Sequence, residues 1–234
     1  MGTAASAQIA VIALSDKNEI VRAMAANDLV YLAPEDSIRL LSSMLADRSE
    51  FVRREAVFAL GETGSPAAVE PVSSALENDR SPLVRASAAI ALGRIGDVKG
   101  VIPLIEALKR SRSSKDDFIR RSAARSLGQI AEMLRDGRRQ TATPQSFLPQ
   151  KYKPVSSSRP ATAIFPGFIE ATRILIEIAG DSKGSEDTRR EAAYALGSIG
   201  DSSALQFLQF NVNSPDPYLA EICREALLKM PPGT

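Results

Sequence analysis

Apolar and small residues recur along the chain at the spacing of an α-helix, in segments that resemble one another. Five segments share an arginine, which we use as the origin of the alignment: Arg22, Arg53, Arg85, Arg120 and Arg189. Around Arg53, the aliphatic Val52 comes one residue before, the small Ala56 three residues after, and Leu60 seven residues after. Offsets −1, +3, +7 and +10 lie on one side of a helix. Each segment is therefore predicted to form a helix with one buried stripe.

A sixth segment, 218–230, keeps the leucine at offset +7 but has Ala220 in place of the arginine. Glycine pairs follow the stripe in three segments, and we expect them to end the helix there: Gly61 and Gly64, Gly93 and Gly96, Gly197 and Gly200. Asp97 and Asp201 come next and are expected to cap the following helix.

A second apolar run precedes several of these helices, at 68–72, 101–105 and 204–208. Each period of about 31 residues is therefore predicted to be a pair of antiparallel helices. One pair cannot bury its own apolar stripe, whereas stacked pairs can. We call each predicted helix pair a copy of the repeat. The six copies, which together make a single domain over 1–234, are 1–33, 34–64, 65–96, 97–131, 164–200 and 201–230.

The segment that begins at Asp79, DRSPLVRASAAIALGRIGDVKGVIPLIEAL, carries the pattern most clearly. It resembles the HEAT-like repeat family named for phycobilisome lyases, and the resemblance covers nearly the whole chain except about 133–163. Periodicity and resemblance together predict an all-α protein, a right-handed α-solenoid of about six antiparallel helix pairs with an armadillo-type superhelix. Since this family serves many roles, the resemblance specifies the fold far better than the function.

The composition excludes several kinds of chemistry. The chain has no histidine and one cysteine, Cys223, so histidine-based triads and zinc sites are excluded, as is an internal disulfide. Cys223 lies at the buried offset +3, where we expect a small core residue. The net charge is +1, without the basic surplus of a general nucleic-acid binder. No apolar stretch is long enough to span a membrane. We expect a cytoplasmic protein, or one in a stromal-like reducing compartment.

Offsets −2, +1, +5 and +9 form the other stripe of each helix, which by resemblance lines the concave surface of the solenoid. Six of the twelve aromatic residues and several arginines lie on it. The predicted partner-binding residues are Tyr31, Phe51, Arg54, Phe58, Ile90, Arg94, Phe118, Arg121, Arg125, Arg190, Tyr194 and Tyr218. Aromatic residues with arginine are typical of protein-binding hot spots. Phe51 and Phe118 equally fit a role in closing the packing between neighbouring copies.

The arginine column has a separate interpretation. Asp16, Asp47 and Asp79 each lie six residues before an arginine of the column. We expect these arginines to form a structural ladder, holding the inter-helix turn of their own or a neighbouring copy through charge-assisted hydrogen bonds.

The repeat is interrupted at 133–163, which is rich in proline and basic residues. Prolines at this spacing favour extended backbone. Three interpretations stay open: a lid over the groove, a segment that clasps an acidic partner, or an insert without a role. The candidate contact residues are Arg138, Arg139, Phe147 and Tyr152.

No catalytic template or metal-ligand set matches the sequence, so no catalytic or metal residue is assigned and no cofactor is expected. We expect a non-enzymatic scaffold that binds a segment of a partner protein; a homo-oligomer or a heterodimer is compatible with this. By resemblance, the alternative is a bilin lyase subunit, or a phycobiliprotein chaperone or degradation factor, with a linear tetrapyrrole bilin as transient ligand. Arg54, Arg121, Arg125 and Arg190 would then hold the propionates. A third hypothesis is an accessory that docks onto the carrier of a metal cluster during its assembly.

Overall fold

The computed structural model describes residues 11–111, 116–137 and 159–231. The chain divides into two compact units, unit 1 (residues 1–103) and unit 2 (residues 104–234), which are described separately. Helices and short 3₁₀ turns make up the described secondary structure, and no strand occurs within these ranges, so the prediction of an all-α fold is confirmed. None of the helices in these ranges combines the length and the hydropathy that a bilayer crossing requires. That the copies form one continuous domain stays a prediction.

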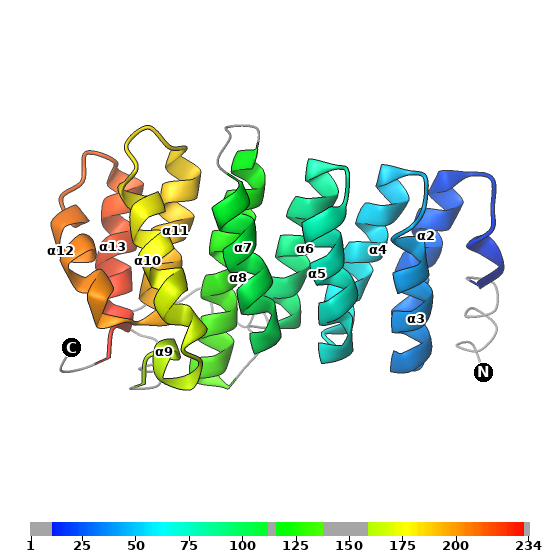
Figure 1. Ribbon diagram of the computed structural model, residues 1–234, viewed down its shortest axis with the longest axis horizontal. Helices are drawn as coiled ribbons and strands as arrows, with labels where there is room; N and C mark the ends of the chain where they lie inside the picture. The colour runs from blue at the N-terminus through cyan, green and yellow to red at the C-terminus, as the bar shows by residue number, and fades with distance from the viewer. Residues whose placement is uncertain (1–10, 112–115, 138–158, 232–234) are drawn as a thin grey trace. The chain divides into compact units, whose positions relative to one another are not determined.

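Unit 1 consists of helices that alternate between two layers (Figure 1). In chain order they are α2 (Glu19–Leu29), α3 (Pro34–Met44), α4 (Glu50–Thr63), α5 (Val69–Asn78) and α6 (Pro82–Ile95). Helices α3 and α5 pack against the next helix in the chain, while α4 contacts both α2 and α6. In each copy we call the helix that contains the position of the arginine column the second helix and the one before it the first helix. The second helices α2, α4 and α6 thus form one layer, and the first helices α3 and α5 cover it.

Unit 2 repeats this arrangement in its described part. Helix α7 (Val101–Arg110) begins at the boundary between the units. Then follow α8 (Asp117–Asp136), α9 (Ala161–Ile164), α10 (Gly167–Gly180), α11 (Glu186–Ile199), α12 (Leu205–Asn211) and α13 (Pro217–Lys229). Helix α11 contacts α8 on one side and α13 on the other, and α10 and α12 pack on α11 and α13 (Figure 1). These are the antiparallel pairs of an α-solenoid, as the periodicity predicts.

Polar side chains start the helices where the sequence places them. Asn18 and Ser81 accept hydrogen bonds from the first backbone N–H groups of α2 and α6. Asp97 and Asp201 do the same for the 3₁₀ turns Val98–Gly100 and Ser202–Ala204, which confirms their predicted capping role.

The predicted stripe is the core. In α4, Val52, Ala56 and Leu60 are each 0% exposed, and the equivalent residues of the other second helices are also buried except Val21 and Leu227, which are half-buried. Cys223 is 0% exposed as well, and burial raises the pKa of its thiol to about 11. A neutral thiol in the core is not a nucleophile, so Cys223 is the small core residue expected.

The prediction that both glycines of each pair end a helix was half wrong. Gly64, Gly96 and Gly200 have positive φ angles and form the C-caps. The first glycine of each pair lies inside the helix. In the fourth copy, which lacks such a pair, Gly128 lies at the same offset. A Cβ built on Gly61 would lie 3.0 Å from Ala91 of α6, and one on Gly197 would lie 2.5 Å from the Cβ of Ala226 in α13. These glycines therefore let second helices of neighbouring copies approach closely.

The fourth copy is longer than predicted. Helix α8 continues to Asp136, and α9 starts at Ala161, so the ends of the expected insertion at 133–163 are helical. Arg135 lies in this extra turn and is 7% exposed. Its guanidinium donates to the carbonyl oxygens of Ser198 (2.7 Å) and Lys229 (2.8 Å), which end α11 and α13. One side chain thus satisfies the C-termini of two helices. The insertion candidates Arg138, Arg139, Phe147 and Tyr152 lie outside the described residues.

Candidate functional site

The candidate surface is the exposed side of the second helices, which we treat as two faces. The unit 1 face comprises the exposed residues of α2, α4 and α6; the unit 2 face comprises those of α8, α11 and α13. At offsets −2 and +5 the unit 1 face carries apolar side chains, Asn27 excepted: Ile20, Phe51, Phe58, Leu83 and Ile90. Their exposed fractions run from 38% for Ile90 to 57% for Ile20. Apolar side chains this exposed, in register on adjacent helices, are typical of an interaction surface.

Charged groups flank the apolar residues of the unit 1 face. Arg94 places its guanidinium 4.5 Å from the centre of the Phe58 ring and pairs with Glu62 at 2.5 Å. Arg54 lies on α4 between Phe51 and Phe58, is half-buried, and makes no hydrogen bond or ion pair with any residue that the structure describes. Arg54 is thus a cation available to a ligand. Tyr31, predicted to continue the helical stripe, lies beyond the end of α2 and is 82% exposed.

The unit 2 face differs from the unit 1 face because arginines of one second helix form ion pairs with carboxylates of the following second helix. Arg121 binds Asp187 and Arg125 binds Glu191, both at 2.8 Å between nitrogen and oxygen. Phe118 lies 5.1 Å from the Arg121 guanidinium. The arginines of this face are therefore already paired with carboxylates of the chain, whereas a ligand with propionates would need arginines without an ion-pair partner.

Arg190 takes part in the same pattern between α11 and α13. It donates to both carboxylate oxygens of Asp216 at 2.9 and 3.0 Å, and its guanidinium stacks 4.9 Å from the Tyr218 ring. The hydrogen bonds that Arg190 donates to Asp216 hold the pKa of Asp216 below its usual range and raise the pKa of Arg190.

Tyr194 belongs to a cluster that the sequence did not predict. Its hydroxyl donates to Glu132 (2.9 Å), which also accepts hydrogen bonds from Ser198 (2.9 Å) and Lys229 (2.6 Å). The Lys229 ammonium lies 4.7 Å from the Tyr194 ring. Burial, together with the nearby carboxylate, raises the pKa of the Tyr194 hydroxyl. Tyr194 therefore acts in packing α8 against α11, and its predicted contact with a partner stays a prediction.

The arginine column forms the expected structural ladder at Arg22 and Arg53. Arg22 holds the carboxylate of Asp47 through Nε (2.7 Å) and Nη2 (2.9 Å), while its Nη1 donates to the carbonyl of Asp16 (2.8 Å). Arg53 does the same with the carboxylate of Asp79 and the carbonyl of Asp47. These two arginines thus bind their own turn and the turn of the following copy, whereas Arg85 donates to the carbonyl of Asp79 in its own turn and Arg189 to the carbonyl of Ala179. In the fifth copy the neighbouring Arg190 takes the aspartate instead of Arg189.

No chemical reaction centre emerges from these contacts. Among the described residues, no three of Cys, Asp and Glu come together as a set that could hold a metal ion. Two carboxylates on these faces, Glu62 and Glu191, are engaged by arginines. The arrangement can recognise apolar and charged groups.

Comparison with known proteins agrees with this architecture. A family model of HEAT repeats matches residues 7–93 and 69–142, and a model of the PBS lyase HEAT-like repeat matches 188–214. No curated protein matches the chain.

Solved structures with a similar fold include natural and engineered proteins. An engineered protein is 19% identical with a TM-score of 0.60, covering 95% of each chain. A designed armadillo repeat protein is 17% identical with a TM-score of 0.58, covering 96% of this chain and 99% of the other. The complex of CpcE and CpcF of phycocyanin lyase from a Nostoc species is 23% identical with a TM-score of 0.56, covering 85% and 65%. At these identities the likeness concerns the fold. Because the HEAT-repeat model spans more than half of the chain, this protein belongs to the HEAT-repeat family.

Proposed function

We propose that this protein is a non-enzymatic scaffold whose unit 1 face binds an apolar segment of a partner protein. The observation that carries the proposal is the row of Phe51, Phe58 and Ile90 with their neighbours, which stay 38–57% exposed, whereas residues of the opposite stripe in α4 and α6, such as Leu60 and Leu92, are 0% exposed. Covering such side chains removes apolar surface from water, worth roughly 25 cal/mol for each Å² buried. HEAT repeats generally mediate protein interaction, which supports the same conclusion.

Arg54 adds a charge preference to this face. It lies one helical turn from both Phe51 and Phe58 and makes no ion pair within the described part of the chain. A partner carboxylate beside the apolar residues would pair with this guanidinium in a partly desolvated setting. The partner is therefore proposed to be an apolar segment that carries an acidic residue.

The experiment compares partner capture by the native chain and by a Phe58→Ser, Ile90→Ser variant. Captured proteins are identified by mass spectrometry from the native host, and the candidate partner is then purified and titrated by calorimetry. We expect the double substitution to weaken the binding about tenfold or more, because truncated hot-spot side chains dominate binding energy. The control is Phe210→Ser on α12, which removes a side chain that is 84% exposed outside the face.

The thermal midpoint separates a binding effect from a folding effect. Both substituted side chains are about 40% exposed, so the double variant is expected to remain folded with a modest fall in Tm. Unfolding at assay temperature would assign these side chains to the core, and unchanged affinity in a folded double variant would contradict the proposed face.

A second candidate function is the transient binding of a linear tetrapyrrole. Two observations favour it: the likeness to phycocyanin lyase, and Arg54 lying open beside two aromatic rings, where it suits a propionate. Titration with phycocyanobilin, followed by visible absorption, tests it. A saturable red shift that is lost in Arg54→Gln would support a bilin ligand. An unchanged spectrum up to high micromolar concentration would remove it and leave the protein-binding proposal in place.

A further inference from the structure

Arg120 is a ladder arginine without a carboxylate. Arg22 and Arg53 each hold an aspartate of the following copy through Nε and Nη2, at 2.7 and 2.9 Å. Arg120 occupies the same column at the start of α8 and is half-buried. Within the residues that the structure describes, it makes no hydrogen bond and no ion pair. The ladder therefore has an open position in unit 2.

The sequence of the next turn explains why the position is open. Asp47 and Asp79 each come two residues before the serine at the helix start, and they accept that serine's N–H at 2.8 Å. Before Ser185, the residue in this place is Lys183. Asp181 lies two residues earlier, where it accepts the N–H of Lys183 at 3.0 Å. The aspartate of this turn therefore lies two residues before the ladder position, which is occupied by Lys183.

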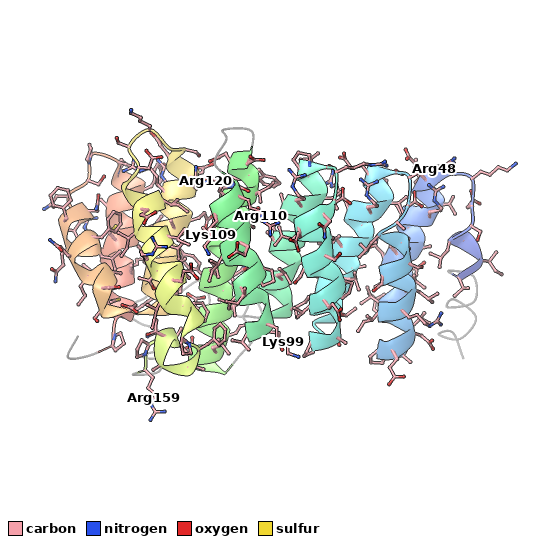
Figure 2. All side chains as sticks on the ribbon, viewed as in Figure 1. Arg48, Lys99, Lys109, Arg110, Arg120 and Arg159 are labelled. Atoms are coloured by element: carbon pink, nitrogen blue, oxygen red, sulfur yellow. The ribbon has the colours of Figure 1, made fainter. Side chains whose placement is uncertain are left out.

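A cavity of about 590 Å³ adjoins Arg120 in unit 2. It is lined by Leu108, Lys109, Arg120, Arg173, Ile174, Glu177, Ile178 and Asp181. Lys109 binds Glu106 and Glu170, both at 2.8 Å, and Arg173 binds Glu177 at 3.0 Å, so these two cations are engaged. Figure 2 labels Lys109 and Arg120 in this region, between α7 and α8 on one side and α10 on the other. Among the cations that line this cavity, Arg120 is therefore the one whose N–H groups make no hydrogen bond within the described residues.

The chain's remaining segments hold no side chain that fits this position. Residues 1–10, 112–115, 138–158 and 232–234, which lie outside the described ranges, contain neither aspartate nor glutamate. We propose that the Arg120 cavity binds the carboxylate of an acidic side chain from another protein chain, in the place of the missing ladder aspartate. Glu177 and Asp181 line the same cavity and repel a second negative charge, which favours a carboxylate over a phosphate. This site shares no residue with the unit 1 face.

The test follows the Nε–H resonances of the full-length chain labelled with ¹⁵N-arginine. Sodium acetate is titrated in exchange for sodium chloride at constant ionic strength, with sodium phosphate as the second arm. We expect acetate to shift, saturably, the resonance that is missing from the spectrum of Arg120→Gln. A stronger response to phosphate would overturn the assignment to a carboxylate, and no response to either anion would overturn the site.

Two variants make the test specific. Lys183→Asp returns the aspartate to the ladder, so it should abolish the acetate response and raise Tm by about 3 °C. Arg173→Gln removes a cation of the same cavity that is already paired, so it should keep the response. An undiminished acetate response in Lys183→Asp would contradict the proposal. So would a fall of several degrees in Tm for Arg120→Gln, because it would reveal a structural partner. Either failure leaves the unit 1 face proposal untouched.

Discussion

Arg53 stabilises the chain through two kinds of contact at once. Its Nε and Nη2 bind the Asp79 carboxylate, while Nη1 donates to the carbonyl of Asp47 at 3.0 Å. The two side chains are only 4% and 8% exposed. Removing one partner of so buried a pair leaves the other charge in a poorly solvated site, which costs far more than an exposed pair is worth.

Replacing Arg53 by glutamine is therefore expected to lower the free energy of unfolding by about 3 kcal/mol, because Asp79 loses its cation. Urea denaturation followed by circular dichroism measures the change. Arg48→Gln is the matched control, since the Arg48 side chain is exposed in the same turn (Figure 2), and its loss should cost less than about 0.5 kcal/mol. Equal effects of the two substitutions would contradict the ladder.

The same ladder predicts a dependence of stability on pH. The hydrogen bond from Arg22 holds the pKa of Asp47 below its usual range. A depressed folded-state pKa means that the stabilisation is present above the unfolded-state value of about 3.9 and is lost as the pH falls through the folded-state value. Tm of the native chain should therefore drop between about pH 5 and pH 2, and Asp47→Asn should start lower at pH 7 and drop less steeply. Parallel curves would contradict this.

At this scale the sequence predicted the buried stripe, the capping aspartates and the structural role of the arginine column. It left open whether an arginine holds its own turn or a neighbouring one, and the structure has it holding both. It could not predict the partners of Tyr194. The Tyr194 hydroxyl meets Glu132 only because α8 packs against α11, and these helices are separated in the chain by the insertion. Long-range side-chain partners of this kind carry no local signal.

At the scale of helices, the glycines inside α4, α8 and α11 set how closely these helices pack on the second helix of the next copy. A Cβ on Gly197 would lie 2.5 Å from the Cβ and 2.6 Å from the Cα of Ala226, so backbone would have to move. Gly180 ends α10, and a Cβ built on it would have a Phe207 ring carbon at 3.8 Å as its nearest neighbour. The two glycines are both helical and differ in the space around them.

Helix propensity alone predicts that alanine at either glycine stabilises by up to about 1 kcal/mol. Packing reverses the sign at Gly197, where we expect a loss of about 2 kcal/mol from overlap with α13. Chemical denaturation of Gly197→Ala and Gly180→Ala gives both values. A stabilised Gly197→Ala would mean that α11 and α13 can separate without cost.

Helix boundaries show where local reasoning fails. The sequence after Ala131 looks like the start of a polar, proline-rich insertion, yet α8 runs on to Asp136. The extra turn is stable because Arg135 binds the last carbonyls of α11 and α13. Those acceptors lie more than 60 residues away in the chain, so the periodic pattern gave no reason to extend the helix.

For the whole molecule, the repeat period was enough to predict the fold class, since stacking follows from copies that cannot bury their own stripe. Binding specificity did not follow from the period in the same way. Two faces with the same offsets differ, one apolar around Phe58 and one closed by ion pairs such as Arg125 with Glu191. The difference depends on which residues of adjacent copies come into contact.

The register of α11 against α8 is set by residues on the two helices, which predicts that the intervening segment is dispensable for folding. Gly128 fits against Tyr194 and Ala195, and Glu132 binds Ser198. Replacing 138–158 by a ten-residue Gly-Ser linker, which spans up to about 33 Å, should keep the helical circular dichroism signal and the Tm within a few degrees. A large loss of helicity would assign a structural role to that segment.

The ladder also has a direction, because Arg22 and Arg53 each donate forward to a carboxylate of the copy that follows. Asp16, at the first turn, accepts from the Asn18 N–H and has no arginine bound to its carboxylate within the described residues. An engineer who fuses a further hairpin ahead of it must therefore supply a guanidinium in register. A hairpin fused after the last copy meets Ala220 in the arginine column, so that junction needs Ala220→Arg as well as a new carboxylate.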